Sequence, residues 1–145
     1  MKTVTVVEQT KAMLSEHGSS SWMKGMYCRV ILDPNGLGGP GEYITCRCIT
    51  GALKEIGESM HTIEERCFGG HNDLIENASS EITATIKSMY SEQFSYIVDF
   101  NDAPGTTYLD VLRVLDETIT RLNGPAWRQT APALRTRFLR GSENI

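Results

Sequence analysis

The residues best suited to recognising a ligand are five arginines near the end of the chain. No acidic residue lies between Glu117 and Glu143, and two aromatic residues are interleaved with the arginines: Arg121, Trp127, Arg128, Arg135, Arg137, Phe138 and Arg140. Arginine forks bind phosphate oxygens, and aromatic faces stack on planar groups. The pattern predicts a cationic patch for a small anionic ligand, phosphorylated or nucleotide-like, or for an acidic patch on a partner protein. A solvated terminal helix, or a tail that packs on a second copy of the chain, would have the same composition.

A second polar feature is the turn at Asn101 and Asp102, ahead of a predicted helix that carries Arg113. Asn and Asp are turn formers whose side chains bond to nearby backbone amides, and this structural role is the simplest explanation of the pair. A polar pair at a helix entrance can also hold a ligand hydroxyl or amide. The predicted ligand-binding residues are Trp22, Asn101, Asp102, Arg113, Trp127, Arg128, Arg135 and Arg137.

The candidate metal ligands are four cysteines and two histidines: Cys28, Cys46, Cys48, Cys67, His61 and His71. A zinc site needs C-x₂₋₄-C spacing or a second matched pair, and the C-x-C pair of Cys46 and Cys48 has neither. We therefore expect free buried thiols that fill space on a helix, with no metal and no cofactor.

Catalysis has little support in the sequence. Neither G-x-S-x-G nor H-E-x-x-H occurs, and the Gly-rich segment 36–41 lacks the Lys-Ser/Thr pair of a phosphate-binding loop. A thiol nucleophile would need a base beside it, and the sequence-near candidates are Cys67 with His61 or His71. Binding is therefore favoured over catalysis.

The composition is that of an ordinary soluble domain. The 145 residues are 40% hydrophobic and 22% charged with a net charge of −4, which fits a single domain over residues 1–145. No apolar run approaches the ~18–20 residues of a membrane span, and the sequence does not open like a signal peptide. We therefore expect a cytoplasmic protein without membrane partners. The acidic balance also argues against binding of duplex nucleic acid.

The spacing of apolar residues predicts a mainly α fold. We expect a single compact domain of four to five helices, with room for a small two- or three-stranded β-sheet (α+β) from residues 27–32, 42–45 and 96–100, the last extended or helical. Helices are predicted from the Thr5–Glu8 capping box to Gly18, from Cys46 to about Gly57, from Asn72 to Met89, from Thr106 or Thr107 to Gly124-Pro125, and briefly near Thr62 and Leu134. The predicted core is Val7, Leu14, Ile49, Leu53, Ile56, Ile75, Ile82, Ile86, Leu112, Leu115 and Ile119.

Three short motifs carry a resemblance to a known family. Trp22 follows the first helix, C-x-x-G-A-L spans 48–53, and the N-D turn at 101–102 precedes a D-V-L helix start at 110–112. In this order the chain resembles a family of uncharacterised small proteins common in actinobacteria and their phages, from about Glu8 to Ile119. The Gly-rich loop and the Arg-rich tail depart from that pattern. The resemblance implies a bacterial or phage origin and brings no activity with it; the small pair Gly51-Ala52 would most simply let another helix approach closely.

Together these features predict a non-catalytic phage-type binding protein that captures a small phosphorylated or nucleotide-like ligand. Sequestering a host immune signal in the cytoplasm of a bacterial host cell would be one such role. The alternative is a protein-interaction module, homo-oligomeric, that binds a host or phage protein through its Arg-rich C-terminal tail.

Overall fold

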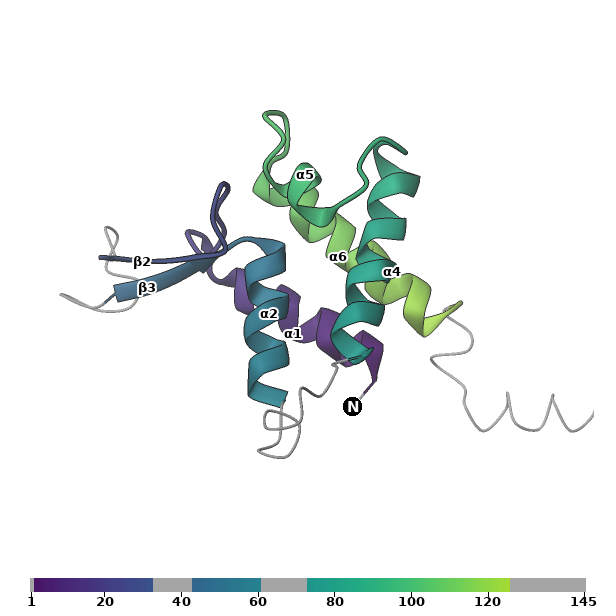
Figure 1. Cartoon of the computed structure of the whole chain (residues 1–145), viewed down its shortest axis with the longest axis horizontal. Coiled ribbons are helices and arrows are strands. Elements are labelled where there is room, and N and C mark those ends of the chain that lie inside the picture. The colour runs from purple at the N-terminus through teal and green to yellow at the C-terminus, as the bar shows by residue number, and fades with distance from the viewer. Residues whose placement is uncertain (1, 33–42, 61–72, 126–145) are drawn as a thin grey trace, which may run out of the picture.

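The computed structural model describes residues 2–32, 43–60 and 73–125. In these ranges it is mainly helical with a small antiparallel sheet, which confirms the predicted fold class (Figure 1). The elements in chain order are α1 (Thr3–Ser15), β1 (Glu16–Ser19), β2 (Cys28–Leu32), β3 (Tyr43–Arg47), α2 (Ile49–Met60), α4 (Asp73–Met89), α5 (Ile97–Asn101) and α6 (Tyr108–Asn123).

Helix α1 begins earlier than predicted. Its first residue is Thr3, and its N-cap is Lys2, which makes no side-chain cap hydrogen bond. The Thr5–Glu8 capping box therefore lies inside the helix and does not start it. Gly18 has a left-handed φ of 62°, as a glycine cap would, but α1 has already ended at Ser15.

Strands β2 and β3 form an antiparallel hairpin, with Val30 opposite Thr45. The hairpin projects away from the helices (Figure 1). The two predicted strands are confirmed, whereas the third candidate, 96–100, is mostly the short helix α5.

The predicted helix start at Cys46 was wrong, because Cys46 lies on β3 and α2 begins at Ile49. Ile44 and Cys46 alternate on the buried side of the strand, with exposures of 1% and 5%. The apolar residues alternate along the strand up to Cys46 and follow helical spacing from Ile49. Because Cys46 and Ile49 are three residues apart, Cys46 also fits the helical pattern. Gly57 does not end α2 either; it is buried within the helix, which continues to Met60.

Helices α4 and α6 follow the predicted pattern closely. In α6, the N-cap Thr107 and Asp110 form a reciprocal capping box, and Gly124 follows the last turn with a φ of 75°. The two helices pack against each other, and between them the Thr118 hydroxyl donates to the Thr85 hydroxyl over 2.8 Å. Met89, predicted on the apolar stripe of α4, is 41% exposed because it lies at the end of that helix.

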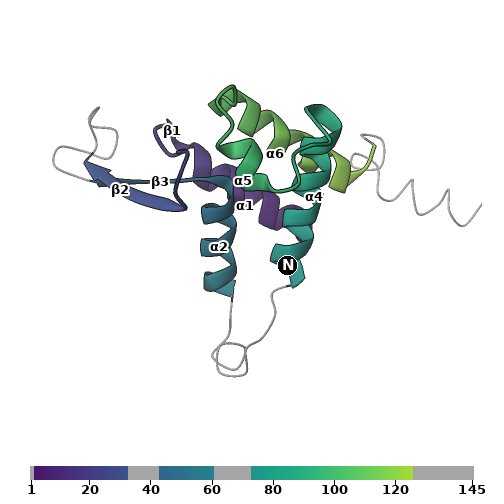
Figure 2. The same ribbon diagram turned by 45° about the horizontal axis from the view of Figure 1, so that its top comes forward.

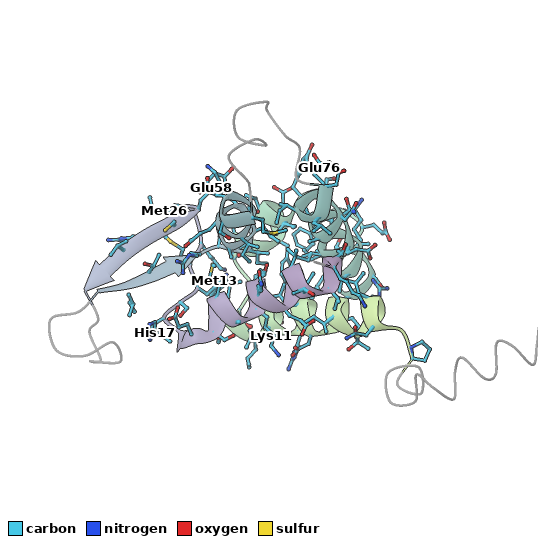
Figure 3. The ribbon with its side chains drawn as sticks, turned by 90° about the horizontal axis from the view of Figure 1, so that it is seen from below. Lys11, Met13, His17, Met26, Glu58 and Glu76 are labelled. Atoms are coloured by element: carbon cyan, nitrogen blue, oxygen red, sulfur yellow. The ribbon has the colours of Figure 1, made fainter. Side chains whose placement is uncertain are left out.

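One buried cluster joins the helices, with α1 packed against α2, α4 and α6 (Figures 2 and 3). Most of the predicted core residues are in it; Ile75 and Ile119 are only partly buried against it, and Leu112 is half-buried. The cluster consists of Val6, Val7, Leu14, Ile49, Ala52, Leu53, Ile56, Ala78, Ile82, Ile86, Ile97, Phe100, Val111, Val114 and Leu115. None of the helices described has both the length and the apolar character that crossing a bilayer would demand.

Candidate functional site

The candidate site is built around the side chain of Asn101, at the end of α5. Its Oδ1 accepts from the indole Nε1 of Trp22 over 2.8 Å and from the amide of Ile49 over 3.3 Å. Its Nδ2 donates to the carbonyl of Met23 and to Oδ1 of Asp102, each over 3.0 Å. We call this set of contacts the Asn101 junction. It ties the segment after β1, the start of α2 and the end of α5 to one carboxamide.

Asp102 extends the junction toward the surface. Its Oδ1 also accepts from the backbone amide of Gly25 over 2.9 Å. Beside it, the ammonium of Lys24 donates to the carbonyl of Ala103 over 2.6 Å. The segment 22–25 is therefore held against the α5–α6 turn by contacts nearly eighty residues apart in sequence.

The backbone at Tyr27 also lies very close to the backbone at Cys48 and Gly51. The amide of Cys48 donates to the carbonyl of Tyr27 over 3.2 Å, and a Cβ placed on Gly51 would lie 1.8 Å from that same carbonyl oxygen. The close approach predicted for Gly51-Ala52 is thus real, but its partner is the Tyr27 backbone and not a helix. The reason is that the segment before β2 crosses directly over the first turn of α2.

A cavity of about 330 Å³ opens on the outer side of the junction. We call it the Asp102 cavity. Its walls come from the segment before β2, the residue before α2, helix α5 and the turn after α5. The lining residues are Gly25, Met26, Tyr27, Cys48, Val98 and Asp102. Figure 3 places Met26 where the hairpin meets α2.

The thiol of Cys48 on the cavity wall is affected by its burial and by the charge of Asp102. Burial raises the pKa of the Cys48 thiol, and the negative charge of Asp102 raises it further, although the Gly51 amide opposes this by donating to the sulfur over 3.2 Å. The thiol therefore keeps its proton at neutral pH. A protonated thiol is a weak nucleophile, so this cysteine is suited to lining a binding site rather than to attacking a substrate.

The outer wall of the cavity is aromatic and apolar. Met26 and Tyr27 are 54% and 53% exposed, which is high for side chains of this size. The ammonium of Lys54 lies 5.7 Å from the centre of the Tyr27 ring, within the range of a cation–π interaction. A positive charge is therefore present beside the cavity.

The predicted binding residues fall into three groups. Trp22 and Asn101 meet at the junction, where the indole of Trp22 donates to the carboxamide of Asn101. Asn101 therefore has a structural role, but its partners Trp22, Met23 and Ile49 are distant in sequence and are not the nearby turn amides that were expected. Of the predicted residues that the structure describes, Asp102 is the one that lines the cavity. Arg113 is 67% exposed on α6 and lies 4.0 Å from Asp110. Trp127, Arg128, Arg135 and Arg137 lie outside the described residues.

Sequence reasoning missed the remaining lining residues. The signal for the segment 24–27 was Gly25, whose φ of 83° only glycine adopts readily. Cys48 belongs to the C-x-x-G-A-L motif, but that motif does not indicate that its side chain lines a cavity. Val98 was not predicted, because the sequence left 96–100 open as extended or helical and the cavity wall is formed by residues far apart in the chain.

The cysteines differ from expectation in one respect. Cys28, Cys46 and Cys48 are free thiols, but Cys28 is exposed instead of buried, and none of the three fills space within a helix. Among the residues described, no group of three or more His, Cys, Asp or Glu side chains is placed to hold a metal ion. Cys67, His61 and His71 lie outside those residues.

Comparisons with known proteins place the chain in a family but not in a function. No curated protein and no solved structure shows significant similarity to it. One family model, described as a family of unknown function (DUF6197), matches residues 1–121, which include the Asn101 junction and the whole Asp102 cavity. The chain therefore belongs to the DUF6197 family.

Proposed function

We propose that this protein is a non-catalytic binding protein that captures a small nucleotide-like ligand in the Asp102 cavity. The observation that carries the proposal is a cavity with one carboxylate, a neutral thiol and apolar and aromatic walls, next to a rigid junction. Small-molecule sites in proteins have this character: a mostly apolar hollow with a few placed polar groups.

The size of the cavity supports a ligand with a planar ring. About 330 Å³ lies near the lower end of the ~300–1,000 Å³ typical of ligand pockets. A heteroaromatic base can lie against the exposed ring of Tyr27 and the side chain of Val98, as planar groups do on aromatic and apolar walls.

The rigidity of the wall supports binding without chemistry. The polar atoms of Asn101 bond within the protein, so this residue positions Asp102 and the 22–25 segment instead of reacting. A preorganised wall lowers the entropy cost of binding a ligand.

The phosphorylated part of the ligand and the biological setting are also proposals. The Arg-rich tail would contribute phosphate contacts, on the strength of its composition. The setting would be the cytoplasm of a bacterial host cell, and sequestering a host immune signal there would be one role. That setting depends on the resemblance to small proteins of actinobacteria and their phages.

Filling the cavity tests the proposal. Val98 lines the cavity, so the larger side chain of Val98→Phe should occupy space that the ligand needs. We expect the affinity for a nucleotide to fall at least about tenfold, which corresponds to ~1.4 kcal/mol of binding free energy. The measurement is isothermal titration calorimetry against a panel of nucleoside monophosphates, preceded by native mass spectrometry of the protein as purified.

The matched control is Leu109→Phe, since Leu109 is 61% exposed on α6 and does not line the cavity. It should bind like the parent protein. Nucleotide binding that survives Val98→Phe in a folded variant would place the ligand elsewhere and refute the assignment to this cavity.

A second candidate function is a protein-interaction module. The observation in its favour is a run of exposed apolar side chains entering the hairpin, with Met26, Tyr27 and Val30 54%, 53% and 61% exposed. Within the described part of the chain, β2 pairs only with β3, so its other edge has no strand beside it. Exposed strand edges are templates for pairing with another chain. The partner would be a second copy of the protein, or a host or phage protein that also contacts the Arg-rich tail.

A further inference from the structure

The carboxylate of Asp102 bears on which end of a nucleotide, the base or the phosphate, can enter the Asp102 cavity. Oδ1 of Asp102 accepts from Gly25 and Asn101. Its Oδ2 has no hydrogen-bond partner among the residues the structure describes. A carboxylate oxygen can only accept hydrogen bonds, so it matches a ligand group that donates, such as an amine.

The rest of the wall adds no positive charge to offset this carboxylate. The lining residues that the structure describes include no Lys or Arg. The Cys48 thiol is neutral, because burial and the charge of Asp102 raise its pKa. A phosphate group inside the cavity would therefore lie against the negative charge of Asp102, which repels it. The ammonium of Lys24, which lies beside Asp102, bonds to the carbonyl of Ala103 and does not line the cavity.

Positive charge is found instead at the rim. Lys54 is exposed on α2, and its ammonium lies 5.7 Å from the centre of the Tyr27 ring, itself part of the cavity wall. A phosphate attached to a base in the cavity would reach water on this side. The charges thus run from negative inside to positive outside.

We infer that the cavity binds the base of an amino-bearing nucleotide, with the amine donating to Oδ2 of Asp102 and the phosphate held outside near Lys54. The inference rests on the proposed function and narrows it. The ligand class is a nucleotide whose base carries an exocyclic amine, namely adenine, cytosine or guanine. Asp102 recognises the base, and Lys54 recognises the phosphate.

Two variants separate these roles in a calorimetric titration of the full chain. The probes are adenosine, cytidine and guanosine, their 5′-monophosphates, and inorganic phosphate. Asp102→Asn should weaken a nucleoside and its monophosphate by the same factor, about tenfold, as expected for a lost hydrogen bond to a charged group. Lys54→Gln should weaken only the monophosphate, by about fivefold or less, as expected for an exposed charge pair.

The control for overall charge is Asp99→Asn, an exposed residue of α5 that does not line the cavity. It should leave all affinities unchanged. Circular dichroism and thermal melting establish whether each variant is folded. If Asp102→Asn does not fold, Lys54→Gln still tests the inference.

Each contrary result has its own meaning. If Asp102→Asn tightens monophosphate binding, the phosphate enters the cavity and the inference is wrong, while the proposed function stands. The same holds if inorganic phosphate displaces a bound nucleotide and the nucleosides do not bind. If the parent protein binds none of the nucleotides, the proposed function itself fails, and the inference with it.

Discussion

The neighbouring residues Asn101 and Asp102 have different roles because their burial differs. Asn101 is 0% exposed, and a buried carboxamide must have its hydrogen bonds made within the protein. It makes them to Trp22, Met23, Ile49 and Asp102. Asp102 is exposed and uses one oxygen for the junction. Its other oxygen is available to a ligand, so of the two only Asp102 suits recognition.

Asp110 is a second carboxylate whose surroundings set its behaviour. Its Oδ2 accepts from the amide and hydroxyl of Thr107 over 2.8 and 2.9 Å, and its Oδ1 accepts from the hydroxyl of Tyr90 over 3.0 Å. The Thr107 amide is the main cause of the lowered pKa of Asp110. Hydrogen bonds to the charged form favour it over the neutral form.

We expect Asp110→Asn to lower the free energy of unfolding at pH 7 by about 0.5–2 kcal/mol, the usual value of a helix cap. Because the native pKa is below the ordinary 3.8, the carboxylate stabilises the fold above pH 3.8, and this contribution disappears as the pH falls through the native pKa. Urea unfolding from pH 7 to pH 3 should therefore show the two proteins converging in acid.

The control for this comparison is Asp116→Asn. Asp116 is 56% exposed and pairs with Lys11 on the surface over 2.5 Å, and such pairs contribute ~0–1 kcal/mol. A difference between Asp110→Asn and the parent that persists undiminished at pH 3 would contradict the assigned role of the charge.

At the scale of elements, the first turn of α2 decides the shape of the cavity. It places the amide of Ile49 on Asn101, the amide of Cys48 on Tyr27, and Gly51 under the Tyr27 carbonyl. Only glycine allows the crossing segment to lie this close, because any Cβ would overlap the carbonyl oxygen. The C-x-x-G spacing of the sequence thus reflects the place where the segment before β2 crosses the start of α2.

Replacing Gly51 with Ala should therefore disrupt this crossing. The added Cβ would lie 1.8 Å from backbone atoms, which cannot rotate away as a side chain can, so we expect a loss of about 1–3 kcal/mol, as for overpacked sites. Hydrogen exchange should show faster exchange of the Cys48 amide, which bonds to Tyr27.

Gly105→Ala is the matched control, because nothing lies within 4 Å of a Cβ at that position. It should be neutral or slightly stabilising, by ~0.4–1 kcal/mol at most. Equal stability of Gly51→Ala and the parent would show that the segment 22–27 is free to move away from α2.

At the scale of the molecule, the fold is a helical body with a projecting hairpin (Figures 1 and 2). An isolated two-stranded hairpin is marginally stable in water. This one is anchored at its base, where Arg47 and Ser21 bond over 2.8 Å and Met23 and Arg47 bond over 3.1 Å. The Asp102 cavity lies beside this anchor, so its shape depends on how the hairpin joins the body.

Within the described residues, the Asp102 cavity and the end of α6 lie apart. Helix α6 begins near α5 and the Asn101 junction and runs to the far side of the body (Figure 1). Its 16 residues span ~24 Å, so Arg121 and the end of the helix lie far from the cavity. Whether residues 126–145 contribute to ligand binding stays a prediction of the sequence.

Two changes distinguish an interaction module from a ligand-binding protein. If copies associate through the hairpin, Val30→Lys should lower the mass measured by light scattering, because a charge replaces an apolar group that is 61% exposed. Leu109→Lys, at an equally exposed position, should not. If ligand capture uses the tail, the double variant Arg135→Ala/Arg137→Ala should lose nucleotide affinity with its mass unchanged.

The sequence by itself determined the helical class, the two strands and most of the buried residues. These features depend on local periodicity and on local capping, such as Thr107 with Asp110 and Gly124 after α6. It erred where two periodicities joined, at Cys46, and it left open whether the short apolar run at 96–100 is extended or helical, which the structure resolves as helix α5. Local patterns of this kind do not indicate which distant segment of the chain will pack against a given element.

Only the tertiary structure decided how the site is assembled. Trp22, Cys48, Gly51 and Asn101 were separate motifs in the sequence, and they meet because a buried carboxamide must bond to whatever backbone surrounds it. The same contacts divided Asn101 from Asp102, making the first a structural residue and leaving the second on the cavity wall. The physical reason is that contacts such as the one between Trp22 and Asn101, which are 79 residues apart, depend on packing, which spacing along the chain does not encode.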